Sequence, residues 1–321
     1  MNIPDNVDLV EYFRLNGELE AQDLHGAAYW CDKVKDRFRN GPNVFGATLP
    51  WPKTHEYVRL RPGEISIHAG INGHRKSMVT GQIALHLAEQ GERSCIASLE
   101  MKPEATLGRL ASQAATTSQP SNEFVDAFLG WADDKIIIYD RLDSTPMEAV
   151  LGVCYYATQE LGCQHIFIDS LMKCGIGEDD YNKQKKFLDL LSVCAKQTNC
   201  HIHLVAHMRK GENENKRPGK FDVKGTGAIT DLVDNCFVHW KNIAKRDAER
   251  RQSDGLSLSE SQLKKLDEPD QLLIVAKQRH GEYDGQFKLW FHNDSLQMLE
   301  SDHSKPHIVD IGDFTEPEVQ F

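Results

Sequence analysis

Long apolar runs are missing from this 321-residue chain. No segment approaches the roughly 18 consecutive apolar residues that a membrane-spanning helix needs, so the sequence excludes such a span. The first residues, MNIPDNVDLVEYF, carry acids in place of the basic and apolar regions of a secretory signal, and no signal peptide is expected. Repeats and low-complexity tracts are also missing, and a content of 40% hydrophobic residues indicates a globular protein.

Cysteine pairs of the C-x-x-C type are missing as well, although the chain has eight cysteines. Their scattered spacing argues against a zinc knuckle and against a dense disulfide framework. Several lie inside apolar runs, such as Cys95 in SCIASL, so we expect reduced, buried thiols in a cytoplasmic protein.

An excess of basic residues is the third feature that the chain lacks. Its 37 Lys and Arg residues stand against 48 Asp and Glu residues, which gives a formal net charge of −11. A uniformly basic coat for nucleic acid is therefore excluded. Any binding of DNA or RNA has to use a local basic strip.

The chain does alternate short apolar segments with amphipathic ones over most of its length. We divide it into a helical arm at 1–45, a main domain at 46–300 with a charged insertion at about 244–270, and an acidic tail at 301–321 that we expect to be disordered. Strands that are apolar on both faces and separated by helices indicate a mostly parallel α/β sheet with hairpins at its edge. The expected strands are 64–69, 94–98, 136–139, 165–168, 201–206, 235–240, 271–276 and 287–291, and the expected helices are 76–90, 103–115, 145–161 and 183–198.

A glycine-rich segment, GINGHRKS at 70–77, follows the apolar run EISIHA and opens an amphipathic helix. This is the strand–loop–helix context of the P-loop motif G-x-x-x-x-G-K-[ST], whose backbone N–H groups hold phosphates. Lys76 is expected to reach the β- and γ-phosphates, and Ser77 to ligate Mg²⁺. The expected nucleotide-binding residues are Gly70, Asn72, Gly73, His74, Arg75, Lys76, Ser77 and Met78.

One position departs from that motif, because Arg75 stands where a glycine is expected before the lysine. Glycine permits close backbone approach there, so we expect Arg75 either to adopt an ordinary φ and point outward or to alter the loop. Two alternatives to a working site stay open. One is a chance glycine-rich turn, and the other is a pocket that binds nucleotide but hydrolyses it poorly.

A second element, HIFIDS at 165–170, is an apolar strand that ends in Asp169. Such an aspartate holds the Mg²⁺ shell at the carboxyl edge of a nucleotide-binding sheet. Alone the pattern is weak, since many buried strands end in an Asp that caps a helix. A P-loop about 95 residues earlier makes it a metal-site prediction.

Five segments in this order resemble the RecA-fold hexameric replicative helicases, the DnaB-like enzymes, and most closely the helicase halves of phage and mitochondrial primase-helicases. The resemblance covers about residues 50–299 and implies a RecA-like P-loop NTPase core. The segments are GINGHRKS, SLEM at 98–101, IFIDSL at 166–171, LVAHMRK at 204–210 and GTGAITDLVDN at 225–235.

The resemblance implies catalytic roles for two further side chains. Glu100 is similar to the carboxylate that orients and activates the attacking water, a task that needs a positioned proton acceptor. His207 matches the polar sensor that contacts the γ-phosphate and signals to the DNA loops. The alternatives are a Glu100 that caps the next helix and a His207 with a structural role.

A basic segment follows His207. RKGENENKRPGKFDVK, at 209–224, carries six basic and three acidic residues. In the helicase family the corresponding loop and the turn after it line the central channel and hold single-stranded DNA through backbone contacts. A solvated loop is the alternative. The expected DNA-binding residues are Arg209, Lys210, Lys216, Arg217, Lys220, Lys224, Gly225, Thr226 and Gly227.

Lys277 and Arg279, in the segment AKQRHG, resemble the family's lysine and arginine finger, which reach the γ-phosphate of a neighbouring subunit. A guanidinium supplied across an interface neutralises transition-state charge, so this resemblance predicts a ring. The alternative is an ordinary surface arginine in a hairpin.

The remaining segments are less specific. The apolar stripe at 21–39 needs a surface to cover, as a packed arm or as a linker helix on an adjacent subunit. The insertion is either a solvated helix or a contact to DNA at the ring face. No primase catalytic or zinc module is present, and no primase activity is expected.

Together these features predict an ATP- or other NTP-dependent, Mg²⁺-dependent helicase motor. By resemblance it is a homohexamer that translocates 5′ to 3′ on single-stranded DNA and unwinds duplex in replication, with a primase or another replication protein as a partner. We expect it in the cytoplasm of a bacterium or of a phage host. The alternatives are a RecA-like or clock-protein-like ATPase without unwinding activity, and a nucleotide-dependent DNA-binding oligomer that does not hydrolyse.

Overall fold

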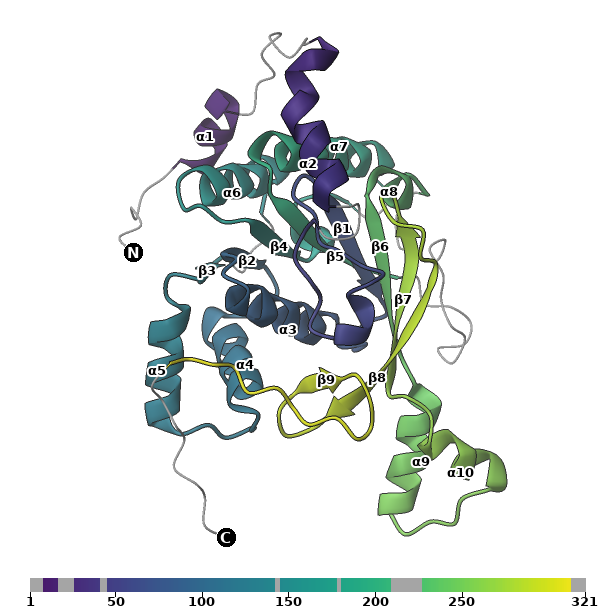
Figure 1. Cartoon of the computed structure of the whole chain (residues 1–321). Coiled ribbons are helices and arrows are strands. Elements are labelled where there is room, and N and C mark those ends of the chain that lie inside the picture. Colours follow the sequence, from purple (N-terminus) through teal and green to yellow (C-terminus); the bar gives the residue numbers. More distant parts are fainter. Residues whose placement is uncertain are drawn as a thin grey trace.

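The computed structural model describes residues 8–16, 26–40, 45–141, 145–177, 180–208 and 227–312. Its centre is a nine-stranded sheet in the order β3-β2-β4-β5-β1-β6-β7-β8-β9 (Figure 1). The strands are β1 (Ile65–Gly70), β2 (Ser94–Ser98), β3 (Ile136–Tyr139), β4 (His165–Asp169), β5 (His201–His207), β6 (Asn235–Lys241), β7 (Gln271–Gln278), β8 (Gly285–His292) and β9 (Gln297–Leu299).

The strands from β3 across to β6 pair in parallel, whereas β6, β7, β8 and β9 pair antiparallel. This arrangement confirms the expected mostly parallel sheet with hairpins at one edge. All six residues of β1 are buried, as the interpretation of its run as a two-faced strand requires.

Helices cover both faces of the sheet. The first two 3-10 turns, η1 (Ala27–Trp30) and η2 (Pro52–Thr54), lie in the N-terminal part of the chain, and η3 (Leu171–Lys173) follows β4. The helices are α1 (Leu9–Asn16), α2 (Cys31–Asn40), α3 (Lys76–Glu89), α4 (Pro103–Ala115), α5 (Asn122–Ala132), α6 (Met147–Gln159), α7 (Tyr181–Thr198), α8 (Gly227–Leu232), α9 (Ile243–Ser253) and α10 (Glu260–Leu266).

Two apolar cores lie between the sheet and its helices. Ile67 of β1 belongs to the core that contains Leu151 of α6 and Phe187 of α7. Phe167 and Phe237 belong to the other core, which contains residues of α3, α4 and α5. Each face of the central strands is thereby removed from water, and this burial supplies the main driving force for the three-layer arrangement.

A row of buried histidines crosses the α3 side of the sheet. His239 of β6, His68 of β1, His203 of β5 and His165 of β4 are joined by ring N···N contacts of 3.1, 3.1 and 3.2 Å. His201 of β5 bonds to the Ser66 hydroxyl at 2.8 Å. These hydrogen bonds satisfy imidazoles that would otherwise be unpaired in an apolar layer.

Three segments differ from the expectations drawn from sequence. Helix α5, between β2 and β3, was not expected; the Ser121 hydroxyl caps it by accepting from the Phe124 N–H at 3.1 Å. The expected disorder of the tail is wrong for residues 301–312, because Val309 is buried and the His307 ring lies 2.7 Å from the Glu89 carboxylate. The charged insertion forms α9 and α10, which project from one end of β6 and β7 (Figure 1).

The N-terminal arm contributes two helices. Tyr12 of α1 donates to the Glu160 carboxylate at 2.7 Å and packs edge-on against Tyr156, next to α6. In α2, Val34 and Phe38 are exposed, so this apolar stripe is uncovered in the single chain.

The eight cysteines all fall in the described part of the chain, and all are free. Seven are buried and Cys31 is exposed, as expected for reduced thiols. Among the residues that the structure describes, no helix has the length and hydropathy needed to cross a bilayer.

The histidine row makes stability depend on pH. Burial lowers the pKa of His68 to about 3 and that of His201 to about 4, and it holds the pKa values of His165, His203 and His239 well below the usual range. The folded protein therefore keeps these rings neutral, whereas the unfolded chain takes up protons below about pH 6.5. Stability is complete above that pH and is lost as the pH falls, by roughly 1.4 kcal/mol per ring and pH unit.

Urea unfolding at pH 7.5 and pH 5.5 measures this loss. We expect a fall of several kcal/mol in the free energy of unfolding, and a smaller fall in a His165→Gln variant, whose side chain hydrogen-bonds but does not titrate. Equal stability at both pH values would mean that the rings are not held neutral in the sheet.

Candidate functional site

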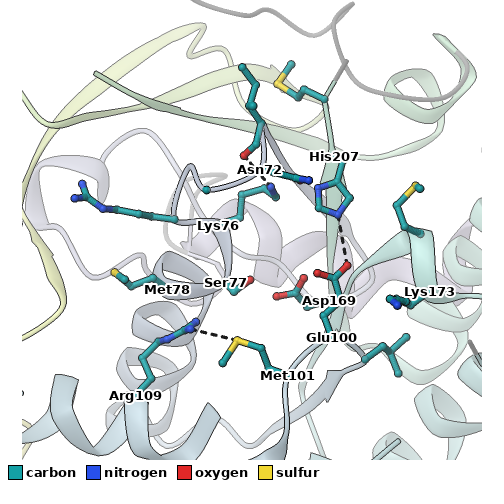
Figure 2. Close-up of a pocket in the computed structure, with 16 residues that line it drawn as sticks. Asn72, Lys76, Ser77, Met78, Glu100, Met101, Arg109, Asp169, Lys173 and His207 are labelled. Carbon is teal, nitrogen blue, oxygen red and sulfur yellow. Dashed lines mark hydrogen bonds and ion pairs between the residues drawn. The ribbon is translucent and has the colours of Figure 1, made fainter. Parts of the chain in front are cut away.

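The parallel register brings four strand ends to one edge of the sheet. Ser98 of β2 pairs with Asp169 of β4, and Gly70 of β1 pairs with His207 of β5. Because β2, β4, β5 and β1 are neighbours, Glu100, Asp169, His207 and the glycine-rich loop meet at this carboxyl edge (Figure 2). Four elements that the sequence predicted for one site are therefore together.

The glycine-rich loop leaves β1 under a tight steric limit. A Cβ at Gly70 would lie 2.8 Å from the carbonyl oxygen of His239, so only glycine fits beside β6. Gly73 has a φ of +79°, which also favours glycine. Helix α3 then begins at Lys76 with no side-chain cap, which leaves its first N–H groups available to an anion.

Lys76 is 6% exposed and folds back onto its own loop. Its amine donates to the carbonyl oxygens of Gly70 at 3.0 Å and Ile71 at 3.1 Å. Burial lowers the pKa of Lys76, and the carboxylates of Asp169 and Glu100 oppose that effect. The amine is therefore a buried cation at the start of α3, in position to meet a phosphate.

Arg75 adopts neither of the arrangements that we expected from sequence. Its φ of +60° is the left-handed conformation of the glycine it replaces, so the expectation of an ordinary φ is wrong. The guanidinium lies over the Phe291 ring of β8, with its carbon 3.6 Å from the ring centroid. A stack of this kind is favourable for arginine and holds the side chain on β8.

Beside it, His74 is 2% exposed, and its Nδ1 accepts from the Lys241 N–H of β6 at 3.2 Å. His74 thus anchors the loop to β6 and does not line the cavity described below.

Asp169 and Ser77 bring two oxygen donors together. Burial raises the pKa of Asp169, and its hydrogen bond with Ser77 acts in the opposite direction. A carboxylate and a hydroxyl are ligands that suit Mg²⁺, which usually takes few protein ligands and completes its shell with phosphate and water. No cluster of three or more His, Cys, Asp or Glu residues that could hold a metal occurs in the described ranges.

Glu100 is held by two neighbours. The Ser170 hydroxyl donates to Oε1 at 2.6 Å, and His207 Nε2 lies 3.5 Å from the same oxygen. The hydrogen bond from His207 is the main cause that lowers the pKa of Glu100 to about 2. Glu100 is therefore a carboxylate at neutral pH and can accept a proton or orient water.

These groups line a cavity of about 910 Å³. Of the predicted residues, Gly70 and His74 do not line it. The residues that do are Ile71, Asn72, Gly73, Arg75, Lys76, Ser77, Met78, Leu99, Glu100, Met101, Arg109, Asp169, Met172, Lys173, His207 and Met208.

Two cations at this cavity were not predicted. Arg109 of α4 donates to the Met101 sulfur at 3.2 Å, and Lys173 of η3 lies on the opposite side, near Glu100 (Figure 2). Arg109 is the single basic residue of α4, PEATLGRLASQAA, and this isolated charge is the one signal that could have marked it. Both cations add positive charge suited to a polyphosphate.

Lys277 and Arg279 lie at the other edge of the sheet. Strand β7 runs antiparallel to β6, so its end reaches the amino ends of the parallel strands. The Lys277 amine donates to the carbonyl oxygens of Thr230, Asp231 and Val233, each at 2.8 Å. Arg279 pairs with Asp234 at 2.8 Å. Their predicted role toward a neighbouring subunit stays a prediction.

The predicted DNA-binding residues Arg209, Lys210, Lys216, Arg217, Lys220, Lys224, Gly225 and Thr226 lie outside the described residues. Gly227 is the first residue of α8. The structure thus places β5 and α8 on either side of the basic segment and leaves its DNA contacts as a prediction.

Comparison with known proteins agrees with this geometry. The chain is similar in structure to a solved ATPase domain of a helicase, with a TM-score of 0.70 at 15% identity, over 86% of this chain and 99% of that one. It is also similar to a DnaB-like replicative helicase whose structure was described with its interactions with primase, with a TM-score of 0.67 at 15% identity, over 90% of this chain and 70% of that one.

These likenesses confirm the RecA-like P-loop fold that the resemblance implied. A family model described as AAA domain matches residues 49–213, more than half of the chain and the whole of the phosphate-binding edge. The chain therefore belongs to the AAA domain family of ATPases.

Proposed function

We propose that this protein is an Mg²⁺-dependent NTP hydrolase that works as a ring-shaped helicase on single-stranded DNA in the cytoplasm. The observation that carries the proposal is the meeting of Lys76, Ser77, Asp169 and Glu100 around one cavity at the carboxyl edge. A site that only binds nucleotide needs the first two, whereas hydrolysis also needs a fixed proton acceptor.

Each group at the cavity has a chemical task. The N–H groups of the loop and of α3 hold the phosphates, and Lys76 turns from its carbonyl partners to the phosphate charge. Glu100, kept ionised by His207 and Ser170, orients the attacking water and accepts its proton. Arg109 and Lys173 stabilise the developing negative charge from two sides.

Magnesium fits the oxygen pair of Ser77 and Asp169, whose mutual hydrogen bond sets both groups at the same point of the cavity. When bound, the ion neutralises charge on the phosphate oxygens. The burial that raises the pKa of Asp169 also makes a cation beside it favourable, because an ion compensates a buried carboxylate.

The ring supports the trans part of the proposal. Lys277 and Arg279 cannot serve the cavity of their own chain, because they lie at the opposite edge of the sheet. A neighbour that presents this edge to the cavity would supply the arginine finger and complete the site. The 5′-to-3′ polarity, the hexamer and a primase partner rest on the family resemblance alone.

A second candidate function is a nucleotide-dependent DNA-binding oligomer that does not hydrolyse. Arg75 favours it, since the glycine of the motif is replaced. The left-handed φ of Arg75 removes the main objection to hydrolysis, because the loop keeps the backbone course that glycine would give.

The first prediction concerns Glu100. We expect Glu100→Gln to lower ATP turnover by about 10²- to 10⁴-fold, because an amide accepts no proton, and to leave nucleotide affinity within a few-fold. The measurement is steady-state hydrolysis with and without single-stranded DNA, beside fluorescence titration of nucleotide. A wild-type protein that binds ATP without turning it over would favour the non-hydrolysing oligomer instead.

The second prediction concerns Lys277. Because its amine satisfies three carbonyl groups at the end of α8, Lys277→Met should lower the free energy of unfolding by about 1–3 kcal/mol. The matched control is Lys288→Met on the exposed side of β8. Urea unfolding of the two variants at the same midpoint would show that the amine does not stabilise α8.

The third prediction concerns the basic segment. Combined Lys216→Ala, Arg217→Ala and Lys220→Ala should weaken binding of single-stranded DNA and reduce the slope of log affinity against log salt by about 0.7 for each lost phosphate contact. Combined Arg246→Ala, Arg250→Ala and Arg251→Ala removes the same charge from α9 as a control. A loss confined to the α9 variant would assign DNA binding to the insertion.

A further inference from the structure

The phosphate loop is tied to a distant part of the chain through Arg75. Its guanidinium covers the Phe291 ring of β8 at 3.6 Å, although more than two hundred residues separate the two along the chain. Among the described side chains, none forms a hydrogen bond with the buried Nη1 of Arg75. The ring is therefore the main contact that fixes this side chain.

This contact bears on the backbone of the loop. A left-handed φ strains any residue that has a Cβ, and such a residue keeps it only where its surroundings hold it there. Arg75 is the residue immediately before α3, so its φ sets the direction in which the first N–H groups of α3 point. A change at Arg75 would turn these groups away from the cavity.

The ring that holds Arg75 is itself joined to the insertion. The Phe291 N–H donates to Asp270 Oδ2 at 2.9 Å, and Asp270 Oδ1 lies 3.2 Å from the Lys245 amine of α9. Lys245 is 6% exposed and also lies 3.6 Å from Glu249. One chain of contacts thus runs from α9 through Asp270 and Phe291 to the phosphate loop.

The space between the loop and α9 is open. A cavity of about 400 Å³ separates Arg75 from Arg246, Glu249 and Arg250, so α9 reaches the loop through β8 and does not pack directly on it. Since α9 and α10 project from the end of β6 and β7 (Figure 1), they can move without disturbing either core.

We propose that Arg75 and Phe291 form a latch that makes the nucleotide-ready loop depend on β8 and, through Asp270 and Lys245, on the α9–α10 hairpin. Phe291 is a positioning residue that acts through Arg75. The inference rests on the proposed nucleotide function and adds its regulation: a force or partner that displaces α9 from β8 opens the latch and weakens nucleotide binding. The arginine in the motif is then a coupling device and not a degenerate glycine.

The test is a set of affinities for an ATP analogue with a fluorescent methylanthraniloyl group, measured with Mg²⁺ at equal protein stability. Phe291→Leu should raise Kd roughly tenfold, the result expected when the ready loop falls to about a tenth of the population. Arg75→Ala should do the same, because it keeps the Cβ strain and loses the stack. Arg75→Gly should bind like the wild type, because glycine adopts the left-handed φ without help.

The decisive comparison is between backgrounds. In the Arg75→Gly protein, adding Phe291→Leu or Lys245→Met should change Kd by less than about twofold, whereas each should weaken binding in the Arg75 protein. Trp290→Leu is the matched control, since it removes a ring with a lysine 5.4 Å from its centroid on the neighbouring residue of β8. It should leave Kd unchanged.

Equal losses from Phe291→Leu in both backgrounds would overturn the latch and assign the effect to general damage at β8. Wild-type affinity in Arg75→Ala would overturn it as well, because the strain would then need no stack. A wild-type protein that binds no nucleotide would overturn the proposed function together with the latch, and this result differs from the other two because every variant then fails alike.

Discussion

Strand β1 pairs with β5 on one side and with β6 on the other, and every residue of it is buried. The chain can leave such a strand only by turning sharply at its carboxyl end, where Gly70 passes so close to His239 that no Cβ fits. The turn becomes the phosphate loop, and the helix that follows begins with uncapped N–H groups. The anion-binding character of the loop is thus a consequence of where β1 lies.

The same constraint organises the charges. Because the strand ends are aligned, two carboxylates and a buried lysine share one cavity. Their pKa shifts differ in direction: burial raises the pKa of Asp169, whereas hydrogen bonding lowers that of Glu100. Two acids in one site are thereby separated into a buried group suited to a cation and an ionised group suited to water. This division arises from the neighbours of each acid and not from the sequence motif.

The residues that sequence could predict are those whose position follows from a strand end. Glu100, Asp169 and His207 each end or follow a parallel strand, and local pattern suffices to place them. Arg75, Arg109 and the histidine row depend on partners from other strands and helices, whose side-chain contacts no local pattern encodes. Helix α5 and the packed residues 301–312 were missed for the same reason, since burial on the α3 side stabilises both.

The antiparallel part of the sheet completes the functional argument. Reversal at β7 carries Lys277 and Arg279 to the amino edge, while the cavity occupies the carboxyl edge. Under the proposed function, each chain then holds two unlike halves of a site on opposite edges, and only a head-to-tail contact brings unlike halves together. Such contacts close into a ring when the rotation between chains permits and otherwise extend as a filament. Turnover is therefore a property of the assembly, and the binding of Lys277 and Arg279 at the end of α8 links that assembly to the helix that follows the basic segment.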